Sequence, residues 1–295
     1  MTTNRFLSLP VIAFCALGVI WGSNFIYMKL AANLISPMQI VFFRVLFGFV
    51  PVLIYARWRG VLSWQHSKYI GHFFIMAMLA TAVYYYGFAK GTSLLLSGVA
   101  GAVSGAIPLF SFLLAVLFLA EERASIIKIA GILVGFIGVV IICRPWEIDV
   151  ATTNLEGVLY IVAGSLCLGA AFVYAKKFII PLKIPAAALT TYQLGLGLLA
   201  LTLVTDYQGI SQIFTNPHAT LGLIVGLGLL GTGLAYIIYY YIVENLGAVA
   251  ASSVTYIPPV VALVIGTLLV GEPIGWTDYL ATVLIFVGVF LLRRK

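Results

Sequence analysis

Hydrophobic residues run in long blocks along this chain, separated by short polar breaks. A helix needs about 20 mostly apolar residues to cross a bilayer. Blocks of that length recur ten times, and the polar stretches between them stay within about 15 residues. The pattern predicts an all-α membrane protein with ten transmembrane helices, at residues 9–28, 37–56, 70–89, 95–119, 125–143, 156–175, 186–205, 219–241, 248–270 and 275–292.

The weakest break separates the third and fourth predicted helices. Only residues 90–93, with the sequence Lys-Gly-Thr-Ser, interrupt the apolar run there. Glycine and serine favour turns, and the second half carries Glu244 and Asn245 in the corresponding place. We therefore expect a turn at residues 90–93.

Composition places the chain in the lipid bilayer rather than in water. Hydrophobic residues make up 63% of the 295 residues and charged residues only 8%, against about 25% charged in soluble domains. The basic residues form no cluster, so we expect no nucleic-acid partner. Cys15, Cys143 and Cys167 show no paired spacing, so we expect no disulfide, metal site or cofactor.

The positions of lysine and arginine orient the chain in the membrane. With the N-terminus inside, twelve of the sixteen basic residues fall in inner segments, and only Lys29, Lys90 and Arg144 fall in outer ones. Cytoplasmic segments of membrane proteins carry this excess of basic residues. The distribution predicts a multi-pass protein of the cytoplasmic (inner) membrane with both termini in the cytoplasm.

The two halves of the chain repeat each other. At an offset of 150 residues, matching positions are Pro108 with Pro258, Glu122 with Glu272, and Gly138 with Gly288. The repeats cover residues 1–146 and 147–295, with five predicted helices each. Because five is odd, the second copy enters the membrane from the opposite side, so the repeats are inverted.

Inverted repeats are the recurring construction of secondary transporters, since two such copies can open one central site to either side in turn. Proline removes a backbone hydrogen bond and bends a helix. We therefore predict that the halves rock about Pro108 and Pro258 and alternately expose a cavity to each side of the membrane.

Several short motifs, in order along the chain, carry a family resemblance. They are Trp21-Gly22-Ser23-Asn24-Phe25, Arg44 inside the second helix, and Glu122 or Glu272 before the fifth and tenth. Together they resemble the drug/metabolite transporter superfamily, and most nearly its ten-helix EamA-type exporters, with some similarity to the aromatic amino-acid exporters. The resemblance implies export of amino acids or other small metabolites through a cavity lined by the first, third, fourth, sixth, eighth and ninth helices.

Small polar residues in the fourth and ninth predicted helices are candidates to line that cavity. These candidates are Ser97, Gly101 and Ser104, with Ser252, Ser253 and Tyr256. Small residues four apart also serve close helix packing without touching a substrate. Both interpretations stand on the sequence alone, and close packing is the commoner role.

Aromatic residues form a second set of candidates. Tyrosines cluster at residues 84–86 and again at positions 236 and 239–241. Some of these tyrosines suit the membrane interface, but consecutive helical residues point about 100° apart, so at least one of each cluster faces inward. The candidates are Tyr84, Tyr236 and Tyr240, together with Trp21, Asn24 and Tyr27, whose spacing of three predicts one face of the first helix.

Arg44 is the sole charge well inside a predicted helix. A charge inside the membrane is costly enough to imply a function or a partner. Arg44 either binds backbone carbonyls and fixes the fold, the commoner role, or holds a substrate carboxylate. Glu122 and Glu272 precede helices, so we predict that they cap the exposed N–H groups there.

Acidic residues and histidines are missing from the middle of every predicted helix. Proton-coupled transport usually uses such a group, so we expect facilitated diffusion. His66, His72 and His218 lie far apart, and without a nucleophile and base together we expect no enzyme. A small-solute channel, a nucleotide-sugar exporter and a multidrug exporter remain alternatives, and the sequence leaves the oligomeric state open.

Overall fold

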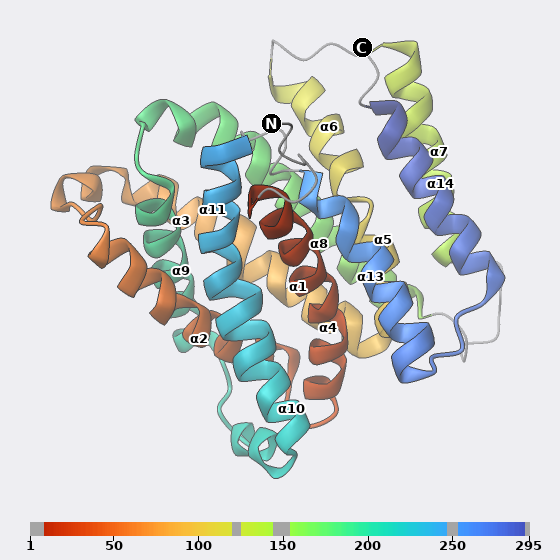
Figure 1. The fold of residues 1–295 in the computed structure, drawn as a ribbon, viewed down its shortest axis with the longest axis horizontal. Helices are drawn as coiled ribbons and strands as arrows, with labels where there is room; N and C mark the ends of the chain where they lie inside the picture. Colours follow the sequence, from red (N-terminus) through yellow and green to blue (C-terminus); the bar gives the residue numbers. More distant parts are fainter. Residues whose placement is uncertain (1–8, 120–124, 144–153, 247–252, 293–295) are drawn as a thin grey trace, which may run out of the picture.

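The protein is a bundle of helices in a computed structural model that describes residues 9–119, 125–143, 154–246 and 253–292 (Figure 1). Within these ranges no strand occurs. The first half contains α1 (Leu9–Ala32), α2 (Pro37–Trp58), η2 (Trp64–Tyr69), α3 (Ile70–Ala77), η3 (Met78–Ala82), α4 (Val83–Leu94), α5 (Ser97–Ser104), α6 (Ile107–Phe118) and α7 (Ile126–Cys143).

The second half repeats this sequence of helices. It contains α8 (Leu155–Tyr174), η4 (Ala175–Ile179), η5 (Ile180–Leu182), α9 (Ala186–Val204), η6 (Ile210–Thr215), α10 (Pro217–Leu221), η7 (Gly222–Leu234), α11 (Ala235–Leu246), η8 (Ser253–Tyr256), α13 (Ile257–Val264), η9 (Ile265–Val270) and α14 (Trp276–Leu292).

These elements combine into ten apolar segments, which confirms the ten-helix prediction. Seven are long enough to cross a membrane, and three shorter ones cover Ile126–Ile142, Val254–Val270 and Trp276–Leu291. We number these ten segments spans 1 to 10 in chain order. Spans 1 to 5 are α1, α2, the run from η2 to α4, α5 with α6, and α7. Spans 6 to 10 are the run from α8 to η5, α9, the run from α10 to α11, the run from η8 to η9, and α14. Large apolar side chains such as Leu133, Leu203 and Val283 are exposed on the outside of the bundle. Such a surface suits contact with the acyl chains of lipids.

The turn predicted at residues 90–93 is wrong. The helix α4 continues through these residues to Leu94, and the break falls at residues 95–96. Ser93 satisfies its hydroxyl inside the helix by donating to the Lys90 carbonyl at 2.7 Å. A serine can bond back to its own helix in this way, and it then does not end the helix.

Prolines lie at the starts of spans 2 and 7. Pro37 is the first residue of α2, and the Ser36 side chain before it accepts a hydrogen bond from the Gln39 backbone N–H. Gln39 in turn accepts from the Ser36 backbone N–H at 3.0 Å, which completes a capping box. Pro185 directly precedes α9.

The packing of the spans follows a two-fold pattern. Each of the following contacts has an equivalent in which both spans are replaced by their counterparts in the other repeat. The contact of span 1 with span 9 corresponds to that of span 6 with span 4, and the contact of span 3 with span 6 to that of span 8 with span 1. The contact of span 2 with span 8 corresponds to that of span 7 with span 3. Spans 5 and 10, 4 and 9, and 2 and 7 each contact their own counterparts. The arrangement is that of two inverted five-helix repeats. The boundary predicted between residues 146 and 147 lies outside the described residues.

Spans 4 and 9 are both broken where the sequence places its prolines. Residues 105–106 separate α5 from α6, and the 3₁₀ turn η8 precedes α13. Pro108 and Pro258 each occupy the second position of the helix after the break. A backbone N–H at that position has no hydrogen-bond partner within the helix, so a proline there removes no helical hydrogen bond. Rocking of the halves about these breaks stays a prediction.

Spans 5 and 10 pack side by side at one edge of the bundle, as α7 and α14 in Figure 1. Glycine allows the close approach. A Cβ atom on Gly288 would lie 2.5 Å from the Gly131 carbonyl oxygen and 2.6 Å from the Gly135 nitrogen, and one on Gly138 would lie 2.6 Å from the Ala281 carbonyl oxygen. The glycines matched between the repeats are therefore packing residues.

We predict that Gly288→Ala destabilises the protein, because the added methyl meets backbone atoms that cannot move aside. Overpacking of this kind costs about 1–3 kcal/mol. Thermal unfolding in detergent measures the effect. Gly71→Ala is the matched control, since its methyl would meet nothing within 4 Å. An unchanged melting temperature for Gly288→Ala would contradict the observed packing of α7 on α14.

Candidate functional site

A pocket of about 140 Å³ lies inside the bundle between the two repeats. Spans 1, 2, 3, 4, 6, 8 and 9 all contribute to its wall, so the set implied by the resemblance is present and span 2 is added. The lining residues are Trp21, Asn24, Phe25, Met28, Arg44, Tyr84, Tyr85, Phe88, Ser104, Ile107, Leu168, Phe172, Tyr236, Tyr239, Thr255 and Pro258.

One face of α1 supplies four of these residues, at positions 21, 24, 25 and 28. This spacing keeps side chains on one side of a helix. Tyr27 was predicted on the same face and is not there: its ring lies against Gly222 and Gly226 of span 8. Six residues after Trp21, at about 100° per residue, it has turned about 120° away from the pocket.

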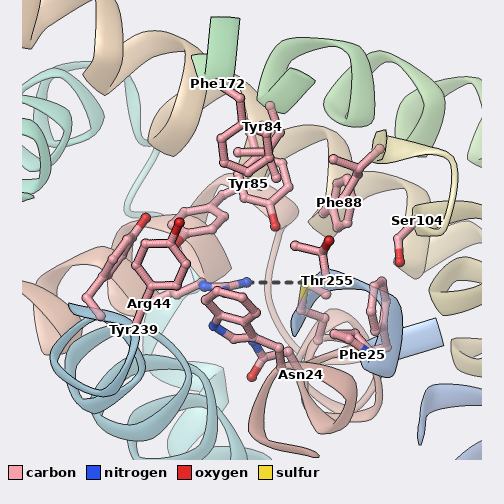
Figure 2. A pocket seen from close by; sticks show the side chains of 16 residues that line it. Asn24, Phe25, Arg44, Tyr84, Tyr85, Phe88, Ser104, Phe172, Tyr239 and Thr255 are labelled. Atoms are coloured by element: carbon pink, nitrogen blue, oxygen red, sulfur yellow. Dashed lines mark hydrogen bonds between the residues drawn. The ribbon is translucent and has the colours of Figure 1, made fainter. Parts of the chain in front are cut away.

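Arg44 stands at the centre of the pocket and is only 5% exposed (Figure 2). Its Nε donates to the Thr232 hydroxyl at 3.1 Å, and its carbon Cζ lies 3.9 Å from the centre of the Tyr85 ring. Its Nη1 lies 4.0 Å from the Met28 sulfur. When the Asn24 amide is oriented to donate to the Ile20 carbonyl, its oxygen accepts from Nη2 at 3.2 Å. All these partners are neutral.

The predicted alternatives for Arg44 can be compared with these contacts. Among the described residues, no backbone carbonyl accepts from the guanidinium and no carboxylate lies within ion-pair distance of it. Side chains from spans 1, 3 and 8 hold it instead. Arg44 therefore contacts side chains of three other spans and also presents its charge to the pocket.

The pocket is closed at one end and more exposed at the other. Phe25, Met28 and Phe88 are buried, and the Phe25 and Phe88 ring centres lie 5.9 Å apart. At the end nearer the start of α1, the lining residues Trp21 and Tyr239 are partly exposed. The labelled aromatic side chains in Figure 2 converge on the same space around Arg44. A ligand bound there would meet a mostly aromatic wall and one cation.

Beyond the closed end, Glu272 links span 9 to span 4. Its carboxylate accepts hydrogen bonds from the Ser97 N–H and hydroxyl, both at 2.7 Å, and from the Gly98 N–H at 2.9 Å. Gly271, at φ +70°, makes the turn that allows this approach. Glu272 was predicted to cap span 10. It caps α5 instead, and Asp278 accepts from the Gly275 N–H at the start of α14.

The structure brings some predicted site residues together and separates others. Trp21, Asn24, Tyr84, Ser104, Tyr236 and Pro258 line the pocket. Tyr27, Ser97, Gly101, Tyr256 and Pro108 do not; Gly101 packs against Ala262 and Phe25, and Tyr256 packs on the hydrophobic core. Glu122 and Ser252, with the side chains of Ser253 and Tyr240, lie outside the described residues.

Sequence reasoning missed Tyr85, Tyr239 and Thr255 as lining residues. Tyr85 and Tyr239 belong to clusters that the sequence marked, but only the rotation of each helix in the bundle selects the inward member. Phe88 follows Tyr84 and Tyr85 at helical spacing, which was an available signal. Leu168 and Phe172 follow Trp21 and Phe25 by 147 residues, so the internal repeat was an available signal for both.

Comparisons with known proteins agree with this architecture. The model of the EamA-like transporter family matches residues 8–144 and again residues 155–294. An uncharacterized transporter of Archaeoglobus fulgidus is 26% identical over 278 residues, covering 93% of this chain and 95% of that protein. The uncharacterized inner membrane transporter YedA of Escherichia coli K12 is 25% identical over 296 residues, covering 96% and 92%. A crystal structure shares the fold, with a TM-score of 0.63 at 20% identity, covering 96% of this chain and 97% of that one.

We predict a measurable energetic coupling between Arg44 and Tyr85. A desolvated cation–π pair contributes about 2 kcal/mol, so Arg44→Met and Tyr85→Leu should be non-additive in unfolding free energy by about 1–2 kcal/mol. Tyr86→Leu is the control, because the Tyr86 ring pairs with Tyr160 and not with Arg44. A double-mutant cycle in detergent measures both couplings. Equal values for Tyr85 and Tyr86 would show that the stacking on Arg44 is unimportant.

Proposed function

The chain belongs to the EamA-like transporter family, and on that premise we propose that it is a secondary transporter that exports amino acids, aromatic or otherwise neutral, across the cytoplasmic membrane. The observation that carries the proposal is the aromatic-walled pocket, with its single cation, between the two inverted repeats. Sites of inverted-repeat transporters lie at this interface. Rings and a hydroxyl-bearing wall suit an aromatic side chain through stacking.

The size of the pocket favours small substrates over the alternatives. Its volume of about 140 Å³ is close to that of a cavity of about 150 Å³ that holds benzene. An amino acid is of this order, whereas a nucleotide sugar is several times larger. The pocket in this conformation supports an amino-acid exporter better than a nucleotide-sugar or multidrug exporter.

Alternating access accounts for the asymmetry of the pocket. The more exposed end lies toward the start of α1 and the end of α11, which the distribution of lysine and arginine assigns to the cytoplasm. The Glu272 contacts lie at the opposite end, where they hold spans 4 and 9 together. This conformation would load substrate from the cytoplasm, and export would then break the Glu272 contacts as the halves rock.

The chemistry of the lining supports downhill transport of an unchanged substrate. None of the sixteen lining residues is an aspartate, glutamate or histidine, the groups that carry protons in coupled transporters. The lining also lacks a nucleophile paired with a base, which covalent catalysis requires. We therefore propose facilitated diffusion and no enzymatic step.

Counterflow in liposomes tests this proposal. Purified protein in liposomes loaded with unlabelled phenylalanine should accumulate labelled phenylalanine transiently and saturably, with no accompanying proton uptake. Transient accumulation requires a carrier, because a channel only equilibrates its solute. Flux that rises linearly with concentration would favour a channel, and a stoichiometric proton flux would overturn the facilitated mechanism.

We predict that Glu272→Ala opens the closed end of the pocket. Hydrogen bonds to a charged group contribute about 1.5–3 kcal/mol each, so their loss should shift the conformational equilibrium at least about tenfold. In a protein whose native cysteines are replaced by serine, Ser104→Cys reports the opening. A membrane-impermeant thiol reagent added from the outer side should label it faster when Glu272 is alanine.

The control for this experiment is Glu156→Ala. The Glu156 side chain is 60% exposed and lies 3.9 Å from Lys90, so its loss should leave labelling unchanged. Equal labelling rates in the Glu272 and Glu156 variants would show that the Glu272 contacts do not close the pocket.

A further inference from the structure

We propose that Arg44 binds the carboxylate of the substrate, and that the substrates are therefore small aromatic or apolar monocarboxylates, of which amino acids are one subset. The inference rests on the proposed transport function and specifies its substrate class. On this inference, binding of a substrate requires its carboxylate and does not require its amine.

The charge of Arg44 is uncompensated in the described part of the chain. The side chain is 5% exposed, and the groups that contact it are a hydroxyl, an amide, a thioether and an aromatic ring. Buried charges in membrane proteins are normally paired, because an isolated one is costly. A carboxylate entering the pocket supplies the missing counter-charge.

The unused N–H groups of Arg44 match the two oxygens of a carboxylate in number. A guanidinium has five N–H groups, one on Nε and two on each terminal nitrogen. The observed contacts with Thr232, Met28 and Asn24 use one on each nitrogen. One N–H on Nη1 and one on Nη2 remain, and two such groups can donate in parallel to the two oxygens of a carboxylate.

The pocket wall offers no carboxylate that would pair with an ammonium group. Its sixteen residues contain no carboxylate, and Arg44 itself repels a second cation. Moving an ammonium group from water into such a pocket costs free energy unless it is paired. The aromatic residues, among them Trp21 and Tyr84, would hold the apolar body of the substrate. The amine of an amino acid therefore has no carboxylate partner among the lining residues.

Three compounds separate these contributions. Phenylalanine carries both groups, 3-phenylpropanoate lacks the amine, and phenethylamine lacks the carboxylate. In counterflow with the wild-type protein, 3-phenylpropanoate should compete with labelled phenylalanine at least as well as unlabelled phenylalanine does. Phenethylamine should compete at least about tenfold less well, which corresponds to about 1.4 kcal/mol. Transport of 3-phenylpropanoate should also carry net negative charge, whereas zwitterionic phenylalanine carries none.

Variants of Arg44 then assign the preference to this side chain. Arg44→Gln should abolish the advantage of both carboxylates over phenethylamine. Arg44→Lys, which keeps the charge but loses the planar fork, should retain part of that advantage. The matched control is Arg59→Gln, since Arg59 is an exposed arginine that also lies near a tyrosine ring, 5.7 Å from the centre of Tyr55.

Each outcome decides between the claims. If the wild-type protein carries phenethylamine as well as phenylalanine, the inference is wrong and the transport function stands. If a folded Arg44→Gln protein keeps the wild-type preference, Arg44 is a structural residue only. Should Arg44→Gln fail to fold, Arg44→Lys and the wild-type competition series still decide. Failure of the wild-type protein to show counterflow with any of the three compounds would remove the proposed function and this inference together.

Discussion

The interior of a bilayer provides no water for a charged group, and Arg44 is where this constraint acts most strongly on the described structure. One guanidinium on span 2 contacts Thr232 on span 8, Asn24 and Met28 on span 1, and Tyr85 on span 3. The pocket lies around this group, where side chains of four spans converge. The same convergence places a cation beside aromatic rings, so the requirement of the fold and the chemistry of the site have one origin.

Around this centre, spans of the two repeats pack closely against each other. Spans 4 and 9 are broken next to the pocket, and between them lie small residues such as Gly98, Gly101 and Ala262. Small residues at that contact let the two spans approach closely. The Glu272 carboxylate supplies polar contacts at the closed end. The closed end therefore combines buried apolar side chains with a few hydrogen bonds.

Much of the architecture could be predicted from the sequence, because the bilayer fixes helix length and because repeated residues reveal duplication. Ten spans, the inversion and the importance of Arg44 all follow from those two facts. The errors have physical causes that local patterns do not contain. The prediction for Tyr27 was wrong because residues spaced three apart rotate progressively around the helix axis. The prediction for Ser97 was wrong because its hydrogen-bond partner, Glu272, is 175 residues away in the sequence.

Among the pocket-lining residues, the full set of inward-facing tyrosines could not be predicted from the sequence. Composition showed that tyrosines gather in spans 3 and 8, but the rotation of each helix is set by its neighbours. Tyr85 faces Arg44 while Tyr86 pairs with Tyr160, and no sequence period distinguishes the two. Phe172 and Thr255 line the pocket because the second repeat packs against the first.

The central claim is that the Arg44 pocket is the substrate site, and direct location of a bound substrate tests it best. Crystals grown with 4-bromophenylalanine would reveal the bromine by its anomalous scattering. The account predicts one bromine peak among the aromatic lining residues, with the carboxylate directed at Arg44. A peak elsewhere, for example in the shallow pocket beside Gln39 and Asp206, with none near Arg44, would contradict it.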